Sequence, residues 1–249
     1  MEKIKVKLQT ESNLIIGGTP NSFEIGGVDM EAVLDYKGDP CIPASSLKGI
    51  LRRIVRELQE EENSDSNSND DSITIWITNL YKNYFNYLLN EINKQAISEE
   101  KLQKTKESLE EIRDHCSAEY LFGIQKVNRS PKFIFNDLQL KKEKDKKKKD
   151  IFSIDTKNAI TLNNDDTVSS NPRTYKTIRP EVTFLGEIWF QGSEQLCKGN
   201  SEVSKEDVEK KILELLEKVF GELNLGIYRM GNSGSRGYGR VHIDIVKGE

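Results

Sequence analysis

A ten-residue glycine loop near the end of the chain, residues 231–240, constrains the chain more than any other segment. It reads Gly-Asn-Ser-Gly-Ser-Arg-Gly-Tyr-Gly-Arg. Glycine accepts positive φ and leaves the backbone open to a ligand, so successive N–H groups can converge on a phosphate. Arg236 and Arg240 add forked donors suited to phosphate, and Tyr238 adds a ring on which a base can stack. A flexible linker is the alternative, but the arginines and the alternating, strand-like segment 241–245 favour a phosphate-binding loop.

Composition limits the class of protein. The chain has 249 residues and a net charge of −4, which allows one large or two small domains and argues against a general binder of polyanions. Local basic patches still permit one face to bind nucleic acid. The three cysteines and two histidines show no zinc-ligand spacing, so we expect reduced thiols in a cytoplasmic protein. No signal peptide is apparent, and no apolar run approaches the roughly 20 residues of a membrane span.

The N-terminal segments alternate between strands and glycine turns. Lysines and apolar residues alternate over residues 3–8, which predicts an amphipathic strand whose lysine face is either solvated or turned toward RNA. The apolar run 14–16 predicts a second strand that ends at Gly17 and Gly18. Asp29 follows another double glycine, and taken alone it is more often a turn residue than a catalytic one.

The clearest helix begins near Ser45 or Ser46, either of which can cap its first turn. Apolar residues recur at helical spacing from Leu47 to Leu58 and predict a buried face. Lys48 lies near the positive end of the helix dipole, which disfavours a cation. A phosphate bound at that end would account for the lysine, and a solubilising face is the alternative.

The remaining segments predict an α+β order. We expect three regions: residues 1–61 as the first part of the core, 62–115 as a flexible loop and an inserted helical segment, and 116–249 as the rest of the core. Within the last region we expect a strand over 133–140, a solvated lysine run over 141–150, a protruding hairpin over about 155–180, a strand over 182–190 and a helix capped by Ser204. The economical packing is a ferredoxin-like (RRM-like) core, with a four-stranded antiparallel sheet and two helices on one face. The open face of such a sheet is a platform for RNA.

Several of these segments together resemble the RAMP superfamily of type III CRISPR effector subunits. Within it the likeness is greatest to the Csm-type backbone subunits that carry the target-RNA nuclease site. The segments that carry the resemblance are, in chain order, 16–18 with 25–29, 42–52, 121–123, 171–173 and 231–239.

The resemblance implies a set of site residues and partners. Asp29 would be the catalytic residue and a ligand of a divalent metal, magnesium. The expected partners are guide RNA, target RNA, other copies of the chain in a filament and other type III effector subunits, with no membrane. The residues implied to bind RNA are Gly17, Gly18, Ser45, Ser46, Lys48, Arg52, Asn171, Arg173, Gly234, Ser235, Arg236, Gly237, Tyr238 and Gly239.

The implied activity is an endoribonuclease that acts within a guide-RNA complex. The hairpin would interrupt the guide–target duplex, and the kinked backbone would bring a 2′-hydroxyl in line with the phosphate. The carboxylate of Asp29 would assist. Three alternatives remain: a guide-binding paralogue without chemistry, a soluble α+β scaffold that binds no nucleic acid, and a guide-processing nuclease. For the last of these, neither His115 nor His242 is placed like a general base.

Overall fold

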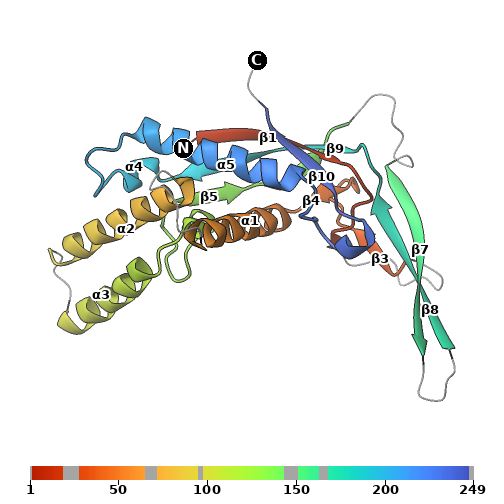
Figure 1. The fold of residues 1–249 in the computed structure, drawn as a ribbon, viewed down its shortest axis with the longest axis horizontal. Coiled ribbons are helices and arrows are strands. Elements are labelled where there is room, and N and C mark those ends of the chain that lie inside the picture. The colour runs from red at the N-terminus through yellow and green to blue at the C-terminus, as the bar shows by residue number, and fades with distance from the viewer. Residues whose placement is uncertain are drawn as a thin grey trace. The chain divides into compact units, whose positions relative to one another are not determined.

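A computed structural model describes residues 2–18, 28–64, 72–94, 98–142, 151–162 and 168–246 (Figure 1). These residues form a mixed α+β fold, as predicted. The strands are β1 Glu2–Thr10, β2 Gly17–Gly18, β3 Met30–Ala32, β4 Cys41–Ile42, β5 Lys132–Phe135, β6 Leu138–Leu140, β7 Phe152–Leu162, β8 Val168–Ile178, β9 Thr183–Gln191 and β10 Val241–Ile245. The helices are α1 Ala44–Ser64, α2 Ile73–Ile92, α3 Glu99–Asp114, α4 Ser193–Leu196 and α5 Lys205–Asn224.

The chain divides into two compact units. The first contains the segments up to Ile4, Leu51–Ile134 and Ile188–Val219. The second contains Lys5–Ile50, Phe135–Glu187 and the chain from Phe220 onward. The second unit therefore holds the glycine loop, the segment of Asp29 and the hairpin.

The main sheet confirms the ferredoxin-like core. Its strands lie in the order β10-β1-β9-β6-β4, with β1 antiparallel to β10, β6 to β9 and β4 to β6. Along the chain the core elements run β1-α1-β6-β9-α5-β10, which is the βαββαβ order of this fold. The predicted alternation of β1 is also confirmed, because Val6 and Leu8 are buried while Lys5 is exposed.

A second sheet, in the order β2-β3-β8-β7, was not predicted. The predicted hairpin is present: β7 and β8 pair over a register that runs from Phe152–Ile178 to Leu162–Val168. Strand β3 runs parallel to β8 and pairs with it only at Tyr175 and Lys176. Between Tyr175 and the start of β8 at Val168, no described strand pairs with β8 other than β7. This outer part of the hairpin is therefore a two-stranded ribbon (Figure 1).

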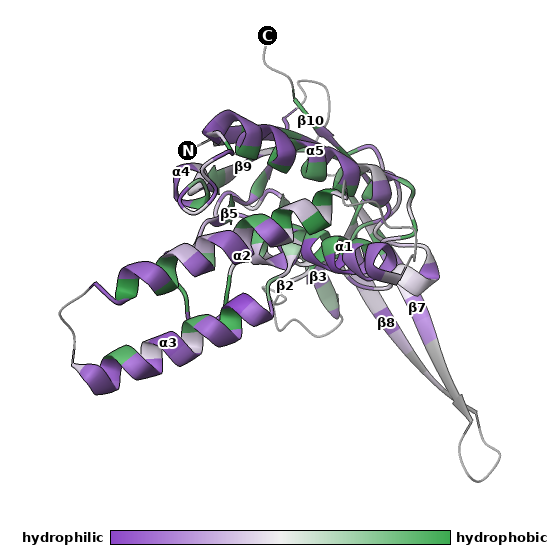
Figure 2. Ribbon diagram, turned by 60° about the vertical axis from the view of Figure 1, so that its left-hand side comes forward, coloured by the Kyte–Doolittle hydropathy of each residue, from purple (hydrophilic) through white to green (hydrophobic). Residues whose placement is uncertain are grey.

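The first unit contains the predicted helical segment as α2 and α3. Tyr81 and Phe85 of α2 are fully buried, with their rings 5.7 Å and 6.1 Å from the ring of Tyr120. These aromatic residues form core, which fits their helical spacing. Helix α3 has no buried residue, and Figure 2 shows hydrophilic residues along most of its length.

Two predicted strands are wrong in detail. Residues 14–16 are buried but form no strand, since Leu14 makes only a single bridge to Ile178. Their apolar character reflects burial in the core rather than membership of a sheet. The predicted strand 133–140 is two strands, β5 and β6, separated at Asn136 and Asp137. The carboxylate of Asp137 accepts a hydrogen bond from the amide of Ala44 at the start of α1.

Candidate nucleic-acid interface

The glycine loop folds back on the segment that precedes β2. The amide of Asn232 donates to the carbonyl of Ile15 at 2.8 Å, and the amide of Gly239 donates to the carbonyl of Asn13 at 2.9 Å. Gly239 has a φ of +78°, and a Cβ there would lie 2.1 Å from the carbonyl oxygen of Met230. The loop conformation therefore requires glycine at this position.

The glycines of the loop differ in their backbone conformation. Gly231, Gly237 and Gly239 have positive φ, whereas Gly234 does not, and Ser233 takes the left-handed conformation beside it. At Gly234 a side chain would meet Arg229, its Cβ lying 2.8 Å from that of Arg229. Close packing, rather than backbone angle, accounts for this glycine.

The outer part of the loop faces solvent. Ser235, Arg236 and Gly237 are exposed, and a Cβ built on Gly237 would meet no atom within 4 Å. The guanidinium of Arg236 is thus accessible to an anionic ligand. The amides of Arg236 and Gly237 are not open to it, because they already donate to carbonyls within the loop, those of Ser233 and Gly234. The RNA-binding roles of these residues stay predictions.

Tyr238 points toward the hairpin. Its hydroxyl donates to the carboxylate of Asp155 on β7, which also accepts from the side-chain amide of Asn13 at 2.9 Å. Burial and the hydrogen bond to Asp155 raise the pKa of Tyr238 to about 12. The ammonium of Lys157 lies 3.5 Å from the centre of the ring. A base that stacks on the face of the ring covered by Lys157 would have to displace this ammonium.

Asp29 lies in an exposed bend directly before β3. Its Oδ2 accepts from the amide of Thr174 on β8 at 2.5 Å, and its own amide donates to the carbonyl of Thr174 at 2.8 Å. The exposed Arg173 is the neighbour of Thr174. The structure thus joins Asp29 to the hairpin at Thr174, the residue that follows Arg173.

The glycine loop lies beside the same bend. The side-chain amide of Asn232 is 3.4 Å from the sulfur of Met30, the residue after Asp29. A Cβ on Gly17 would lie 3.3 Å from that same amide nitrogen. Gly18 pairs with Glu31 of β3. Asn171 pairs through its backbone with Ala159 farther along the ribbon, and its side chain lies outside the described structure.

The predicted cap of α1 is wrong. The helix begins at Ala44, so Ser45 and Ser46 lie inside its first turn. The amide of Ala44 donates to the carboxylate of Asp137 at 2.8 Å, and aspartate is a favoured acceptor at a helix start. Lys48 is half-buried, four residues after that start.

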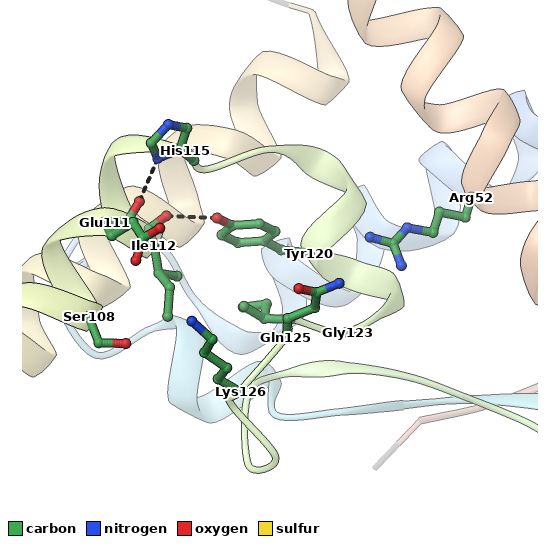
Figure 3. Close-up of a pocket in the computed structure, with 10 residues that line it drawn as sticks. Arg52, Ser108, Glu111, Ile112, His115, Tyr120, Gly123, Gln125 and Lys126 are labelled. Atoms are coloured by element: carbon green, nitrogen blue, oxygen red, sulfur yellow. Dashed lines mark hydrogen bonds between the residues drawn. The ribbon is translucent and has the colours of Figure 1, made fainter. Parts of the chain in front are cut away.

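Arg52 belongs to the first unit and already has an acidic partner. Its Nε lies 2.7 Å from Oε2 of Glu119, which Arg56 also contacts at 2.7 Å. These two guanidinium groups lower the pKa of the Glu119 carboxyl. Arg52 also borders a hollow of about 230 Å³ between the end of α3 and the loop that follows it (Figure 3). Binding of RNA by Arg52 would have to compete with Glu119.

The donor groups limit the kind of metal site that is possible. In the part of the chain that the structure describes, no three His, Cys, Asp or Glu side chains come together as a metal cage. A single exposed carboxylate such as Asp29 does fit magnesium, which is often bound by one or two carboxylates together with substrate phosphates and water.

As for membranes, none of the described helices combines the length and apolar character that crossing a bilayer demands.

These observations define an α+β protein with a ferredoxin-like sheet, in which a glycine loop and an exposed aspartate meet at the inner end of a hairpin. The model of the RAMP superfamily matches residues 7–242, and the chain belongs to this superfamily. A curated relative, the CRISPR system Cms endoribonuclease Csm3 of Methanocaldococcus jannaschii, is 23% identical over 243 residues, which cover 96% of this chain and 77% of the relative.

A solved structure described as the type III-B Cmr-beta bound to cognate target RNA has the same fold. It matches with a TM-score of 0.52 and 19% sequence identity over 98% of this chain. The match covers 60% of the chain in that structure, so this chain is considerably shorter than its structural neighbour.

Proposed function

We propose that the protein is a backbone subunit of a type III CRISPR effector that binds guide RNA and cleaves the complementary target RNA at Asp29. In this proposal copies of the chain assemble along the guide together with other effector subunits. Membership of the RAMP superfamily and the name of the curated relative support it. The observation that carries it is the position of Asp29: exposed, held by Thr174 of the hairpin, and beside the glycine loop.

RNA binding in this proposal relies on the backbone of the nucleic acid. Base pairing with the guide reads the target sequence, so the protein needs contacts to phosphates and sugars rather than to base edges. The exposed Arg236 and Arg173 are suited to such contacts. The two-stranded ribbon of β7 and β8 is the segment that would interrupt the duplex.

The proposed cleavage reaction requires that the hairpin interrupt the duplex and kink the backbone of the target strand. A 2′-hydroxyl oxygen attacks the adjacent phosphorus, the bond to the 5′-oxygen breaks, and the departing 5′-oxygen takes a proton from water. The products are a 2′,3′-cyclic phosphate and a 5′-hydroxyl end. The carboxylate of Asp29 accepts the proton of the attacking hydroxyl, and its bond to Thr174 fixes its direction. Magnesium held by Asp29 and RNA phosphates would stabilise the charge that develops on the phosphate. Alignment of the reacting atoms supplies the larger share of the rate.

A second candidate has a specific observation in its favour. The same hydrogen bond to Thr174 could give Asp29 a purely structural role, in a guide-binding subunit without chemistry. The variant Asp29→Asn separates the two, because an amide oxygen can still accept from Thr174 but cannot act as a base. Asp35 provides a matched control, since its carboxylate also accepts from backbone amides, those of Lys37 and Asp39.

The test is cleavage of target RNA by the assembled complex, with and without magnesium. We expect regularly spaced cuts in the wild type and in Asp35→Asn, a loss of about 10²- to 10⁴-fold in Asp29→Asn, and no cutting after chelation. Guide binding should be unchanged in both variants. Equal cutting by Asp29→Asn and wild type, or cutting by neither, would leave the structural subunit as the function.

A further inference from the structure

The ammonium group of Lys157 on β7 lacks a hydrogen-bond partner. Its Nζ is buried, and among the described residues it is the one buried side-chain nitrogen or oxygen without such a partner. A buried cation left without an acceptor is costly, and each such group in a native structure calls for an explanation. The residues that the structure describes therefore supply no acceptor for the donors of Lys157.

Two tyrosines cover this ammonium. Nζ lies 3.5 Å from the ring centre of Tyr238 in the glycine loop and 5.9 Å from that of Tyr175 on β8. Cation–π attraction offsets part of the lost hydration, but it satisfies none of the three N–H donors. The cover over Nζ is thus formed in part by the loop that is predicted to bind phosphate.

The nearest carboxylate is already engaged. Asp155 lies two residues before Lys157, on the same face of the strand. Its oxygens accept from Tyr238, from Asn13 at 2.9 Å and from Ser153 at 3.2 Å. Loss of hydration and the nearby charge of Arg236 lower the pKa of Lys157. The charge of Arg236 therefore acts on Lys157 and disfavours its protonated form.

We propose that Lys157 is a phosphate ligand for RNA at the glycine loop and that Tyr238 covers its ammonium until RNA binds. A phosphate oxygen is the acceptor that the ammonium lacks, and it brings the negative charge that two neighbouring cations require. When Tyr238 turns away to stack on a base, it uncovers Lys157 in the same movement. This inference rests on the RNA-binding part of the proposed function and is independent of cleavage at Asp29.

The test is the salt dependence of RNA binding. The affinity of the full chain for a fluorescein-labelled single-stranded RNA is measured by anisotropy between about 50 and 200 mM salt. The variants are Lys157→Gln, which removes the charge, and Lys157→Arg, which keeps it. Lys104→Gln is the matched control, since Lys104 is an exposed lysine of α3 paired with Glu100.

Each phosphate contact contributes about 0.7 to the slope of log affinity against log salt for a single strand. We expect Lys157→Gln to make the slope shallower by about that amount, and Lys157→Arg and Lys104→Gln to leave it unchanged. Weaker binding by Lys157→Gln with the wild-type slope would mean that Lys157 only supports the loop, and would overturn the inference. Wild type that binds no RNA would overturn the proposed function as well.

The cover is tested by acetylation of lysines, followed by mass spectrometry. Without RNA, Lys157 should react slowly in the wild type and several-fold faster in Tyr238→Ala, while the rate at Lys104 stays the same. RNA should protect Lys157 from acetylation in Tyr238→Ala, because the phosphate then contacts the ammonium group and shields it from the reagent. Equal rates at Lys157 in both proteins would show that Tyr238 does not cover it.

Discussion

Two neighbouring glycines of the C-terminal loop should respond very differently to the same substitution. Gly237 and Gly239 both have positive φ, +87° and +78°. An alanine at 237 would meet open space, whereas at 239 its Cβ would lie 2.1 Å from the oxygen and 2.9 Å from the nitrogen of Met230. These are backbone atoms, so no side-chain rotation can relieve the overlap.

The expected cost follows from these contacts. Alanine in the left-handed conformation costs about 1–2 kcal/mol at either position. At 239 the backbone must also move, which breaks the hydrogen bond from Met230 to Gly239 and the one from Gly239 to Asn13. Each bond is worth about 0.5–1.5 kcal/mol. Gly239→Ala should therefore lower the free energy of unfolding by about 2 kcal/mol more than Gly237→Ala.

Thermal unfolding followed by circular dichroism measures this difference. For a chain of this size about 1 kcal/mol corresponds to a shift of about 2–4 °C, so Tm of Gly239→Ala should fall about 4–8 °C below that of Gly237→Ala. Equal Tm values for the two variants would refute the reasoning. They would mean that the loop is not held against Met230 and Asn13.

Three further predictions concern single contacts. Glu119→Gln should lower stability at neutral pH by only about 0.5–1 kcal/mol, since the arginine pairs of Glu119 are partly exposed. The folded pKa of Glu119 lies below the usual 4.5, so this stabilisation is present above pH 4.5 and is lost as the pH falls through the folded pKa. The melting temperatures of the variant and the wild type should therefore converge in acid, and a gap that stays constant with pH would contradict the pairing. Tyr81→Phe should cost about 1–3 kcal/mol in urea denaturation, because the buried hydroxyl donates to the carbonyl of Pro131, and no change would exclude that bond. Asp137→Ala should cost about 1 kcal/mol and Asp137→Asn much less, since asparagine also accepts from Ala44, and equal losses would exclude capping.

Periodicity in the sequence was sufficient to predict the regular elements of the core. The alternation over residues 3–8 and the apolar stripe from Leu47 to Leu58 became a buried strand face and a buried helix face. The cap of α5 was also predictable, because Ser204 and its partner Asp207 are three residues apart. Such features depend on residues that are close along the chain, so the spacing of apolar and capping residues in the sequence is enough to predict them.

The predictions that failed concern partners far apart in the sequence. The acceptor at the start of α1 is Asp137, which lies 93 residues along the chain from the amide of Ala44 that donates to it. The prediction of a cap at Ser45 or Ser46 considered only nearby residues and was therefore wrong. The run 14–16 resembles a strand in sequence because a short apolar segment that is simply buried shows the same pattern as a buried strand. The whole second sheet depends on contacts between β3 and β8, which no local pattern reveals.

The sequence by itself determined the glycine loop, the α+β order of the core and the aspartate beside a double glycine, because these follow from backbone freedom and local periodicity. Only the tertiary structure decided which side chains meet there. Tyr238 reaches Asp155 across 83 residues, and Asp29 reaches Thr174 across 145 residues. The register of β3 against β8 fixes the second encounter, and the hydrogen bonds of the glycine loop to Asn13 and Ile15 fix the first. The same fold places the ammonium of Lys157 against the ring of Tyr238.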